Sequence, residues 1–211
     1  MLEIWKGILT QPEETISAQG AKAGLVGGLI NFAIAGLIPG LLLGLVVTGL
    51  LVALGPMLSV FPGADAFVSL GMLAIVIVPI VAVIFAIIGS LLCNLGLWLG
   101  AKAGGGHGSF GAQYHLVSVV FPPLILATIL VCLVTSLLML VPFVGPLLGI
   151  LFMTIAQGYL AIMAIIAYIA AMKVAHGFST KSLAIATGVG YALNLVIFGL
   201  VIGVVALIVL M

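Results

Sequence analysis

The sequence predicts an all-helical integral membrane protein with five transmembrane helices, a cytoplasmic N-terminus and an external C-terminus. Two observations carry this prediction. The composition is extreme, because 65% of the 211 residues are hydrophobic, only 4% are charged and the mean hydropathy is +1.59. Soluble domains carry charge on about a quarter of their residues, so this chain has too little polar surface to coat a soluble globule. In addition, five long apolar runs follow a short polar segment.

Charge and cysteine content narrow the functional classes. The formal net charge is +1 and all five basic residues are lysines, which excludes nucleic-acid binding through a basic surface. The two cysteines, Cys93 and Cys132, lie inside apolar runs, where a thiol behaves as a small hydrophobe. They show no CxxC spacing and have no neighbouring histidine, so we expect neither a disulfide framework nor a redox role.

Residues 1–22 form a polar N-terminal segment that begins with an amphipathic pattern. Leu2, Trp5, Ile8 and Leu9 recur at helical spacing, which predicts a short helix lying in the membrane interface. Trp5 is suited to the headgroup level and is the expected interfacial anchor.

A second polar helix is predicted from about residue 11 to residue 22. Thr10 resembles an N-cap, Pro12 fits a first helical turn, and Glu13 stands at the position that completes a capping box. The alternative is that Glu13 and Glu14 are only favourable charges in the first turn. This helix leads into the membrane domain.

The membrane domain, residues 23–211, contains five apolar stretches long enough to cross a hydrocarbon core of about 30 Å. They are separated by the loop GPMLSVFPGADAF, the glycine-rich loop AKAGGGHGSFGAQ, the short turn VPFVGP and a final turn at Gly177. The short VPFVGP turn predicts an antiparallel hairpin of spans three and four. The predicted spans are about 24–53, 67–99, 114–141, 146–175 and 180–210.

Small residues recur at every fourth position through the first span. On a helix this spacing lines one narrow face, which lets a neighbouring backbone approach closely in a lipid environment. We therefore expect the first span to be the most enclosed one, and the same face could pack within the bundle or between copies of the chain. The packing residues are Gly20, Gly24, Gly28, Gly36, Gly40 and Gly44, followed by Thr48.

Prolines and a glycine mark the ends and interruptions of the later spans. Pro79 interrupts the second span, and Pro122 lies near the start of the third with Pro123. Pro146 suits the first turn of the fourth span, and Gly177 is placed to cap its end. The fifth span is expected to start at Ser179 or Thr180.

The lysines predict the orientation. If the N-terminus is cytoplasmic, all five lysines fall on the cytoplasmic side, and the two outer loops contain none. The loops of the cytoplasmic face then contain Gly104, Gly105, Gly106, His107, Ser109, Phe110, His176, Gly177, Ser179 and Lys181.

The interior of the predicted spans contains no Asp, Glu, Lys or Arg, since Lys173 and Lys181 stand within two residues of the span ends. This argues against a proton relay or an ion-coupled carrier built on intramembrane charge. The polar residues of the spans offer two alternatives. They could form interhelical hydrogen bonds, each worth about 1 kcal/mol or less, or they could line a polar pathway. Among them are Asn31, Asn94, Thr128, Gln157 and Asn194.

Imidazoles and carboxylates gather on the predicted cytoplasmic face, where they could form a metal site. These groups are suitable ligands for a divalent ion, but the sequence offers no pair at i and i+4, and contacts with loops and headgroups are the alternative. We therefore expect no metal and no cofactor. The weak candidates are Glu13, Glu14, His107, His115 and His176.

No catalytic motif is present. The GGGHGSFG loop joins two membrane spans and lacks the Lys and Ser or Thr of a phosphate-binding loop, and neither a Gly-x-Ser-x-Gly elbow nor an HExxH pattern occurs. The sequence therefore does not predict an enzyme.

Three segments resemble the Yip domain family, the five-span proteins named for interaction with Ypt and Rab GTPases. They are WKGILTQPEET, AKAGGGHGSFGAQYHLVSVVFPPLI and AMKVAHGFSTKSLAIA. The resemblance implies a helical bundle with a cytoplasmic N-terminus and partnership with related membrane proteins. The chain lacks the long N-terminal region and the Asp-Leu-Tyr-Gly-Pro motif of eukaryotic members, which counts against GTPase binding and suggests a minimal prokaryotic member in the plasma membrane.

Two functional hypotheses follow. The first is a non-catalytic membrane protein that scaffolds or recruits partners, or shapes the bilayer, through its cytoplasmic face; the lipid bilayer and a second copy or a related membrane protein are its expected partners. The alternative is a channel or transporter for a small ion or solute along a pathway lined by the buried amides, since broken helices at membrane depth are tolerated where they line cavities.

Overall fold

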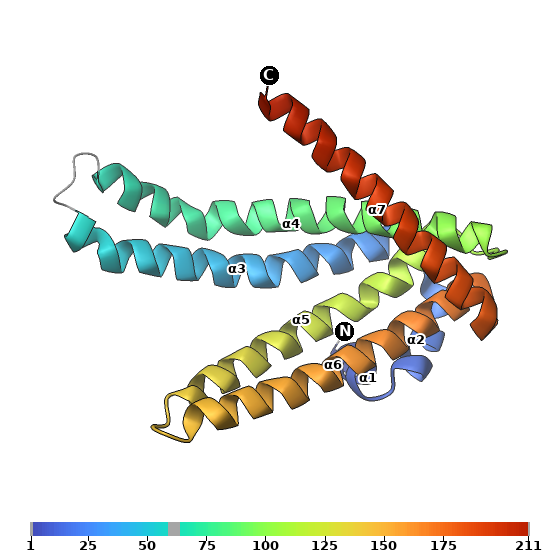
Figure 1. Cartoon of the computed structure of the whole chain (residues 1–211), viewed down its shortest axis with the longest axis horizontal. Coiled ribbons are helices and arrows are strands. Elements are labelled where there is room, and N and C mark those ends of the chain that lie inside the picture. The colour runs from blue at the N-terminus through green and yellow to red at the C-terminus, as the bar shows by residue number, and fades with distance from the viewer. Residues whose placement is uncertain (1, 59–63, 211) are drawn as a thin grey trace. The chain divides into compact units, whose positions relative to one another are not determined.

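The computed structural model describes the backbone of residues 2–58 and 64–210, and within these residues every regular element is a helix (Figure 1). Two short helices and a 3-10 turn precede five long helices. In chain order they are α1 (Leu2–Thr10), α2 (Pro12–Gln19), η1 (Gly20–Lys22), α3 (Leu25–Leu58), α4 (Ala64–Ala103), α5 (Phe110–Met139), α6 (Gly145–His176) and α7 (Thr180–Leu210).

The five long helices, α3 to α7, are each long and apolar enough to cross a membrane. The predicted all-helical class with five such helices and short N-terminal helices is therefore confirmed. Even α5, with 30 residues, measures about 45 Å at 1.5 Å per residue, which exceeds a hydrocarbon core of about 30 Å. Part of each long helix must therefore lie outside the hydrocarbon or tilt within it.

The helix ends differ from the predicted span boundaries. Helix α4, the second long helix, continues to Ala103, beyond the predicted end at residue 99. Helix α5 begins at Phe110, because Ser109 caps it by accepting a hydrogen bond from the Ala112 amide at 3.2 Å. The predicted loop from residue 55 to residue 67 is also shorter, since α3 continues through Leu58 and α4 starts at Ala64. Residues 59–63 of that loop lie outside the described residues.

The predicted N-cap at Thr10 is wrong. Thr10 is the last residue of α1, and its hydroxyl donates to the Lys6 carbonyl at 2.9 Å, so it does not cap the next helix. Gln11 occupies the N-cap position of α2 without a side-chain hydrogen bond. Pro12 begins α2, as its fixed φ angle predicts.

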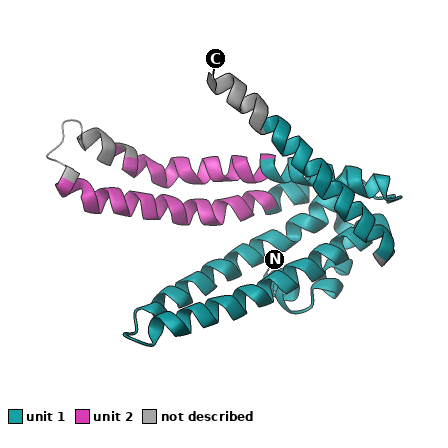
Figure 2. Ribbon diagram, in the orientation of Figure 1, with its two compact units in different colours: residues 1–31, 89–211 teal, residues 32–88 magenta. Residues whose placement is uncertain are grey.

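The chain divides into a main unit, residues 1–31 and 89–211, and a hairpin unit, residues 32–88 (Figure 2). In the main unit, α5 and α6 form an antiparallel hairpin joined by a short turn, as VPFVGP predicted. Gly177 ends α6 in the left-handed conformation with φ of 70°, which confirms its predicted capping role.

The core of the main unit lies around the first half of α5. Every residue from Gln113 to Val120 is buried, and Pro122 and Pro123 are buried as well. The two short helices α1 and α2 pack against α5 and α6, and each buries one isoleucine completely, Ile8 and Ile16. The apolar face of α1 is therefore partly covered by protein.

In the hairpin unit, glycines of α3 face α4. A Cβ atom at Gly36, Gly40 or Gly44 would come within 3.0 Å of an α4 atom, so the helices are in close contact at these positions. Thr48 extends the same face, since its hydroxyl donates to the Gly71 carbonyl at 2.8 Å.

The predicted glycine stripe is not continuous. Gly20 lies in η1 and Gly24 precedes α3, so neither shares the helical face of the later glycines. Gly28 lies in the main unit, where it faces Tyr114. The interruption arises because residues 20–24 form a 3-10 turn and an extended link instead of a first helical turn.

Candidate functional site

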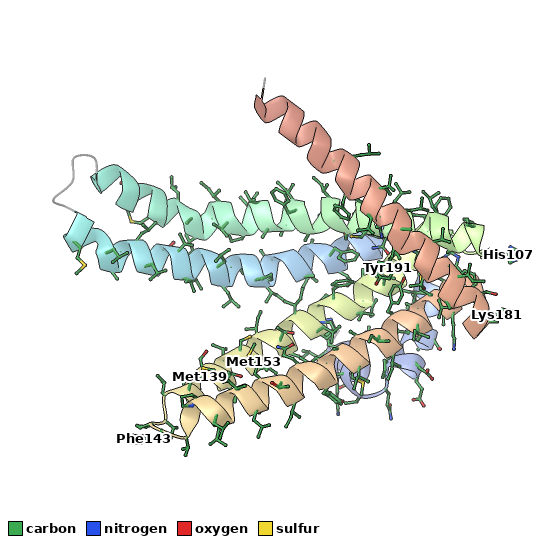
Figure 3. All side chains as sticks on the ribbon, in the orientation of Figure 1. His107, Met139, Phe143, Met153, Lys181 and Tyr191 are labelled. Atoms are coloured by element: carbon green, nitrogen blue, oxygen red, sulfur yellow. The ribbon has the colours of Figure 1, made fainter. Side chains whose placement is uncertain are left out.

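Two loops meet at one end of the main unit. Loop 104–109 follows α4, and residues 177–179 join α6 to α7. Gly108 lies directly against the Ala175 carbonyl, and its own carbonyl accepts a hydrogen bond from the Trp98 indole at 3.3 Å. Figure 3 shows His107 and Lys181 at this end and Phe143, in the α5–α6 turn, at the opposite end. The loops predicted to form one cytoplasmic face thus lie together.

Aromatic contacts hold this end. The ring of His176, the last residue of α6, stacks on Phe178 with 5.3 Å between ring centroids. The Lys102 ammonium lies 5.7 Å from the centroid of the Trp98 ring, a cation–π arrangement. Trp98 also meets the edge of Phe110 at 6.2 Å, and so connects the end of α4 to the start of α5.

A buried amide connects three helices below the loops. Gln113 of α5 is fully buried, and its Nε2 donates to the Asn94 carbonyl of α4 at 3.1 Å. Its Oε1 lies 2.8 Å from Nε2 of His176, at the end of α6. Since Oε1 can only accept, His176 carries a proton on Nε2 in this arrangement.

Asn31 and the start of α5 form a second polar contact. Asn31 Nδ2 donates to the Ser118 hydroxyl at 3.0 Å, and that hydroxyl donates in turn to the His115 carbonyl at 2.6 Å. Ser90 and Tyr114 pair through their hydroxyls at 2.8 Å. Asn31 therefore makes the interhelical hydrogen bond that is one of the two roles considered for the amides of the spans.

Two further asparagines lie on neighbouring helices. Asn94 Nδ2 donates to the Ser90 carbonyl, and Asn194 Nδ2 of α7 donates to the Cys93 carbonyl, both at 2.9 Å. Their exposed fractions are 2% and 8%. Within the described residues, neither Oδ1 atom has a hydrogen-bond partner, although buried carbonyl oxygens normally have one.

Both asparagines line a cavity of about 710 Å³ in the main unit. Its volume is within the range of small-molecule sites in proteins, which are mostly apolar with a few polar groups. The wall is formed by α4, α5, α6 and α7. The lining residues are Cys93, Asn94, Leu97, Val117, Val120, Phe121, Leu124, Ala164, Ile165, Tyr168, Ile169, Leu183, Ala184, Thr187, Tyr191 and Asn194.

The weak metal candidates are not brought together. Glu13, Glu14 and His107 are exposed, whereas His115 and His176 are buried on different helices. Among residues 2–58 and 64–210, no three His, Cys, Asp or Glu side chains converge as a set of ligands.

The remaining predicted residues lie away from the cavity. Gln157 is half-buried on α6. Trp5 lines a smaller hollow of about 330 Å³ between α1 and α5, which Pro123 and Leu130 also border. Trp5 therefore borders a hollow of the protein surface, and its role as an interfacial anchor stays a prediction.

Sequence reasoning missed Gln113 and the aromatic and hydroxyl residues of the cavity, such as Tyr168 and Thr187. A signal for Gln113 existed. It is an uncharged polar residue at the end of the glycine-rich loop, directly before the predicted third span, and in the structure it is the first residue of the buried run 113–120. The sequence contains no signal for the cavity, because the cavity depends on which helix faces converge.

The fold and composition define a multi-span integral membrane protein: five long apolar helices, with short N-terminal helices packed on two of them. No protein-family model matches the chain, and no curated protein or solved structure matches it.

Proposed function

We propose that this chain is a non-catalytic integral membrane protein of the Yip type that scaffolds or recruits partners, or shapes the bilayer, through its cytoplasmic face. The observation that carries the proposal is the docking of α1 and α2 on α5 and α6. Ile8 and Ile16 are completely buried, while Glu13 and Glu14 remain exposed. Packing fixes the two helices and leaves their charged side chains presented outward, which suits a surface for partners.

The orientation belongs to this proposal. With the N-terminus inside and the C-terminus outside, every lysine lies on the cytoplasmic side, as the positive-inside rule requires. The long helices agree with it: Lys102 and Lys173 stand in the last turns of α4 and α6, and Lys181 stands at the start of α7. We place the chain in the plasma membrane of a prokaryote.

The family assignment rests on the three sequence segments alone. It implies partnership with a second copy or a related membrane protein, and the missing motif counts against GTPase binding. The exposed acidic pair of α2 and the clustered loops 104–109 and 177–179 are the surfaces that such a partner would contact.

Site-specific photocrosslinking in membranes tests the proposal. A photoreactive amino acid at Glu14, on the exposed side of α2, should give a discrete protein adduct that saturates as the crosslinking time increases. The matched control is Ile185, which is exposed on the apolar surface of α7 and should give none. Equal labelling at both positions would overturn the proposal.

A channel or transporter is the second candidate, because Asn94 and Asn194 lie beside an internal cavity. Purified protein in liposomes separates the two candidates by flux of monovalent cations, divalent cations and protons. Flux that Asn94→Leu alters would favour the channel. If no ion crosses, the scaffold is favoured.

A further inference from the structure

We propose that the cavity between α4, α5, α6 and α7 binds one bilayer lipid, holding its acyl chain against the apolar wall while two headgroup hydroxyls donate hydrogen bonds, one to Asn94 and one to Asn194. This inference goes beyond the proposed function and does not depend on it. A chain that recruits no partner could still hold a lipid, and the converse is equally true.

The wall of the cavity selects an apolar ligand. Leu97, Val117, Val120, Leu124 and Ile169 supply aliphatic surface from three helices. None of the lining residues carries a charge, so an ion entering the cavity would lose its hydration without gaining a charged partner. An aliphatic chain has no charge to desolvate, and it contacts the wall on several sides.

The two asparagines select a ligand that donates hydrogen bonds. Each side-chain amide uses its nitrogen on a backbone carbonyl of α4, which holds the amide plane and leaves Oδ1 as the free acceptor. Both acceptors are buried and unpartnered among the described residues. Burying an acceptor without a donor is unfavourable, and one ligand hydroxyl at each Oδ1 atom would remove that penalty.

The position of the cavity gives a lipid access to it. Its rim includes Phe121, Ile165 and Tyr191, which are exposed and belong to membrane-spanning helices. The medium at such a rim is lipid, so the bilayer is the source of the ligand.

The depth of the asparagines suits a headgroup at one end of the cavity. Asn94 precedes Lys102 by eight residues, about 12 Å of helix, and Asn194 follows Lys181 by 13 residues, about 20 Å. Both therefore lie within the leaflet on the lysine side or near its inner limit, since half of the hydrocarbon core is about 15 Å. A neutral headgroup with few hydroxyls can reach this depth at lower cost than a charged one.

The probe that tests the proposal is a monoacylglycerol with a diazirine in its acyl chain, mixed into phosphatidylcholine vesicles that contain the purified full chain. After illumination, mass spectrometry of peptides locates the labels. We expect them to concentrate on cavity residues such as Tyr168 and Ala184, and to be suppressed by excess unlabelled monoacylglycerol. Labels spread evenly over the exposed residues of all spans, without suppression, would overturn the proposal.

A pair of variants on one helix tests the cavity itself. Ala184→Trp fills it, whereas Ala192→Trp adds the same side chain at another exposed alanine of α7 that does not line it. We expect Ala184→Trp to reduce cavity labelling at least about tenfold and Ala192→Trp to leave it unchanged. Equal labelling of the two variants would count against the site.

A change in the ligand keeps the test independent of folding. A second diazirine probe has both headgroup hydroxyls methylated, so it fills the same space but cannot donate. With the unmodified protein we expect about tenfold weaker cavity labelling by this probe. If both probes label the cavity equally, the two asparagine oxygens do not select the ligand and the proposal fails in that part.

Water-soluble thiol reagents test the opposite possibility. If they modify Cys93 faster than either lipid probe labels the cavity, the cavity is a water-filled pathway and the lipid proposal is overturned.

Discussion

His176 Nε2 lies 2.8 Å from Oε1 of Gln113, and this contact joins the end of α6 to the start of α5 inside the protein. Gln113 reaches in the other direction to the Asn94 carbonyl at 3.1 Å, so one buried amide connects three helices. The hydrogen bonds lie directly beneath the loops at the lysine-bearing end. They are therefore in a position to fix the lysine-bearing ends of α4, α5 and α6 relative to one another.

Replacing Gln113 by leucine should destabilise the folded protein by about 1–3 kcal/mol, because the buried Nε2 donor of His176 loses its acceptor. The Asn94 backbone carbonyl, which lies inside α4, also loses the donor that it has in addition to its helical hydrogen bond. The measurement is the temperature at which half of the detergent-solubilised protein leaves the monodisperse chromatographic peak. Gln157→Leu is the matched control, since Gln157 is only half-buried. If the two variants have the same melting temperature, the hydrogen bonds of Gln113 contribute nothing to stability.

The five spans could be predicted because hydropathy reports the length of apolar surface directly, and lipid leaves few alternatives to a helix. The ends of the helices were harder to predict. Ser109 caps α5, which starts four residues before the predicted start, while Thr10 uses its hydroxyl within α1 and caps nothing. A hydroxyl can donate to a backbone carbonyl of the preceding turn or accept from a backbone amide of the following turn. The local sequence does not decide which of these hydrogen bonds forms.

The candidate site required tertiary structure. Asn94 and Asn194 were recognised as buried amides, but they are 100 residues apart, and only the packing of α4 against α7 brings them to one cavity. The glycine face was predicted from spacing, yet spacing cannot report that Gly20 and Gly24 precede the helix. Periodicity identifies which residues share a face and leaves open what that face meets.

The orientation predicts which loops a reagent can reach from outside. In a background where Cys93 and Cys132 are replaced by alanine, Phe143→Cys should react with a membrane-impermeant maleimide in intact cells. Phe143 is fully exposed in the α5–α6 turn, opposite the lysine-bearing end. His107→Cys, in the exposed loop after α4, should react only after the cells are permeabilised.

The two labelling patterns control each other, because both cysteines are exposed and differ only in the side of the membrane. The reverse pattern would place the N-terminus outside and would contradict the orientation derived from the lysines. Labelling of both cysteines in intact cells would indicate that the cells were already permeable, which an impermeant dye of similar size reports separately.

The close contact within the hairpin unit predicts a strong effect of side-chain size at Gly40. A Cβ there would stand 2.8 Å from the Pro79 Cα and 2.8 Å from the Ala82 Cβ, so a larger residue must push α3 away from α4. Gly40→Leu should destabilise the protein by about 1–3 kcal/mol, the usual effect of overpacking. The same chromatographic melting measurement applies, with Gly49→Leu on the same helix as control, since a Cβ at Gly49 meets nothing within 4 Å. Equal melting of the two variants would show that α3 and α4 do not depend on this approach.

The contact of α4 with α7 gives the last prediction, and it concerns the helix that closes the cavity. A Cβ at Gly190 would stand 2.9 Å from the Leu97 Cα, and Gly100 lies directly against Gly190 and the Ala186 carbonyl. Gly190→Val should therefore displace α7 and lower the melting temperature, because two helix backbones meet where only hydrogen atoms fit. Gly188→Val, two residues earlier on α7, adds the same side chain where nothing lies within 4 Å and should leave the melting temperature nearly unchanged. Any propensity cost of valine is common to both variants, so the difference between them measures the helix contact alone. If Gly188→Val lowers the melting temperature more than Gly190→Val does, the face of α7 that meets α4 is assigned wrongly. The wall of the cavity is then assigned wrongly as well.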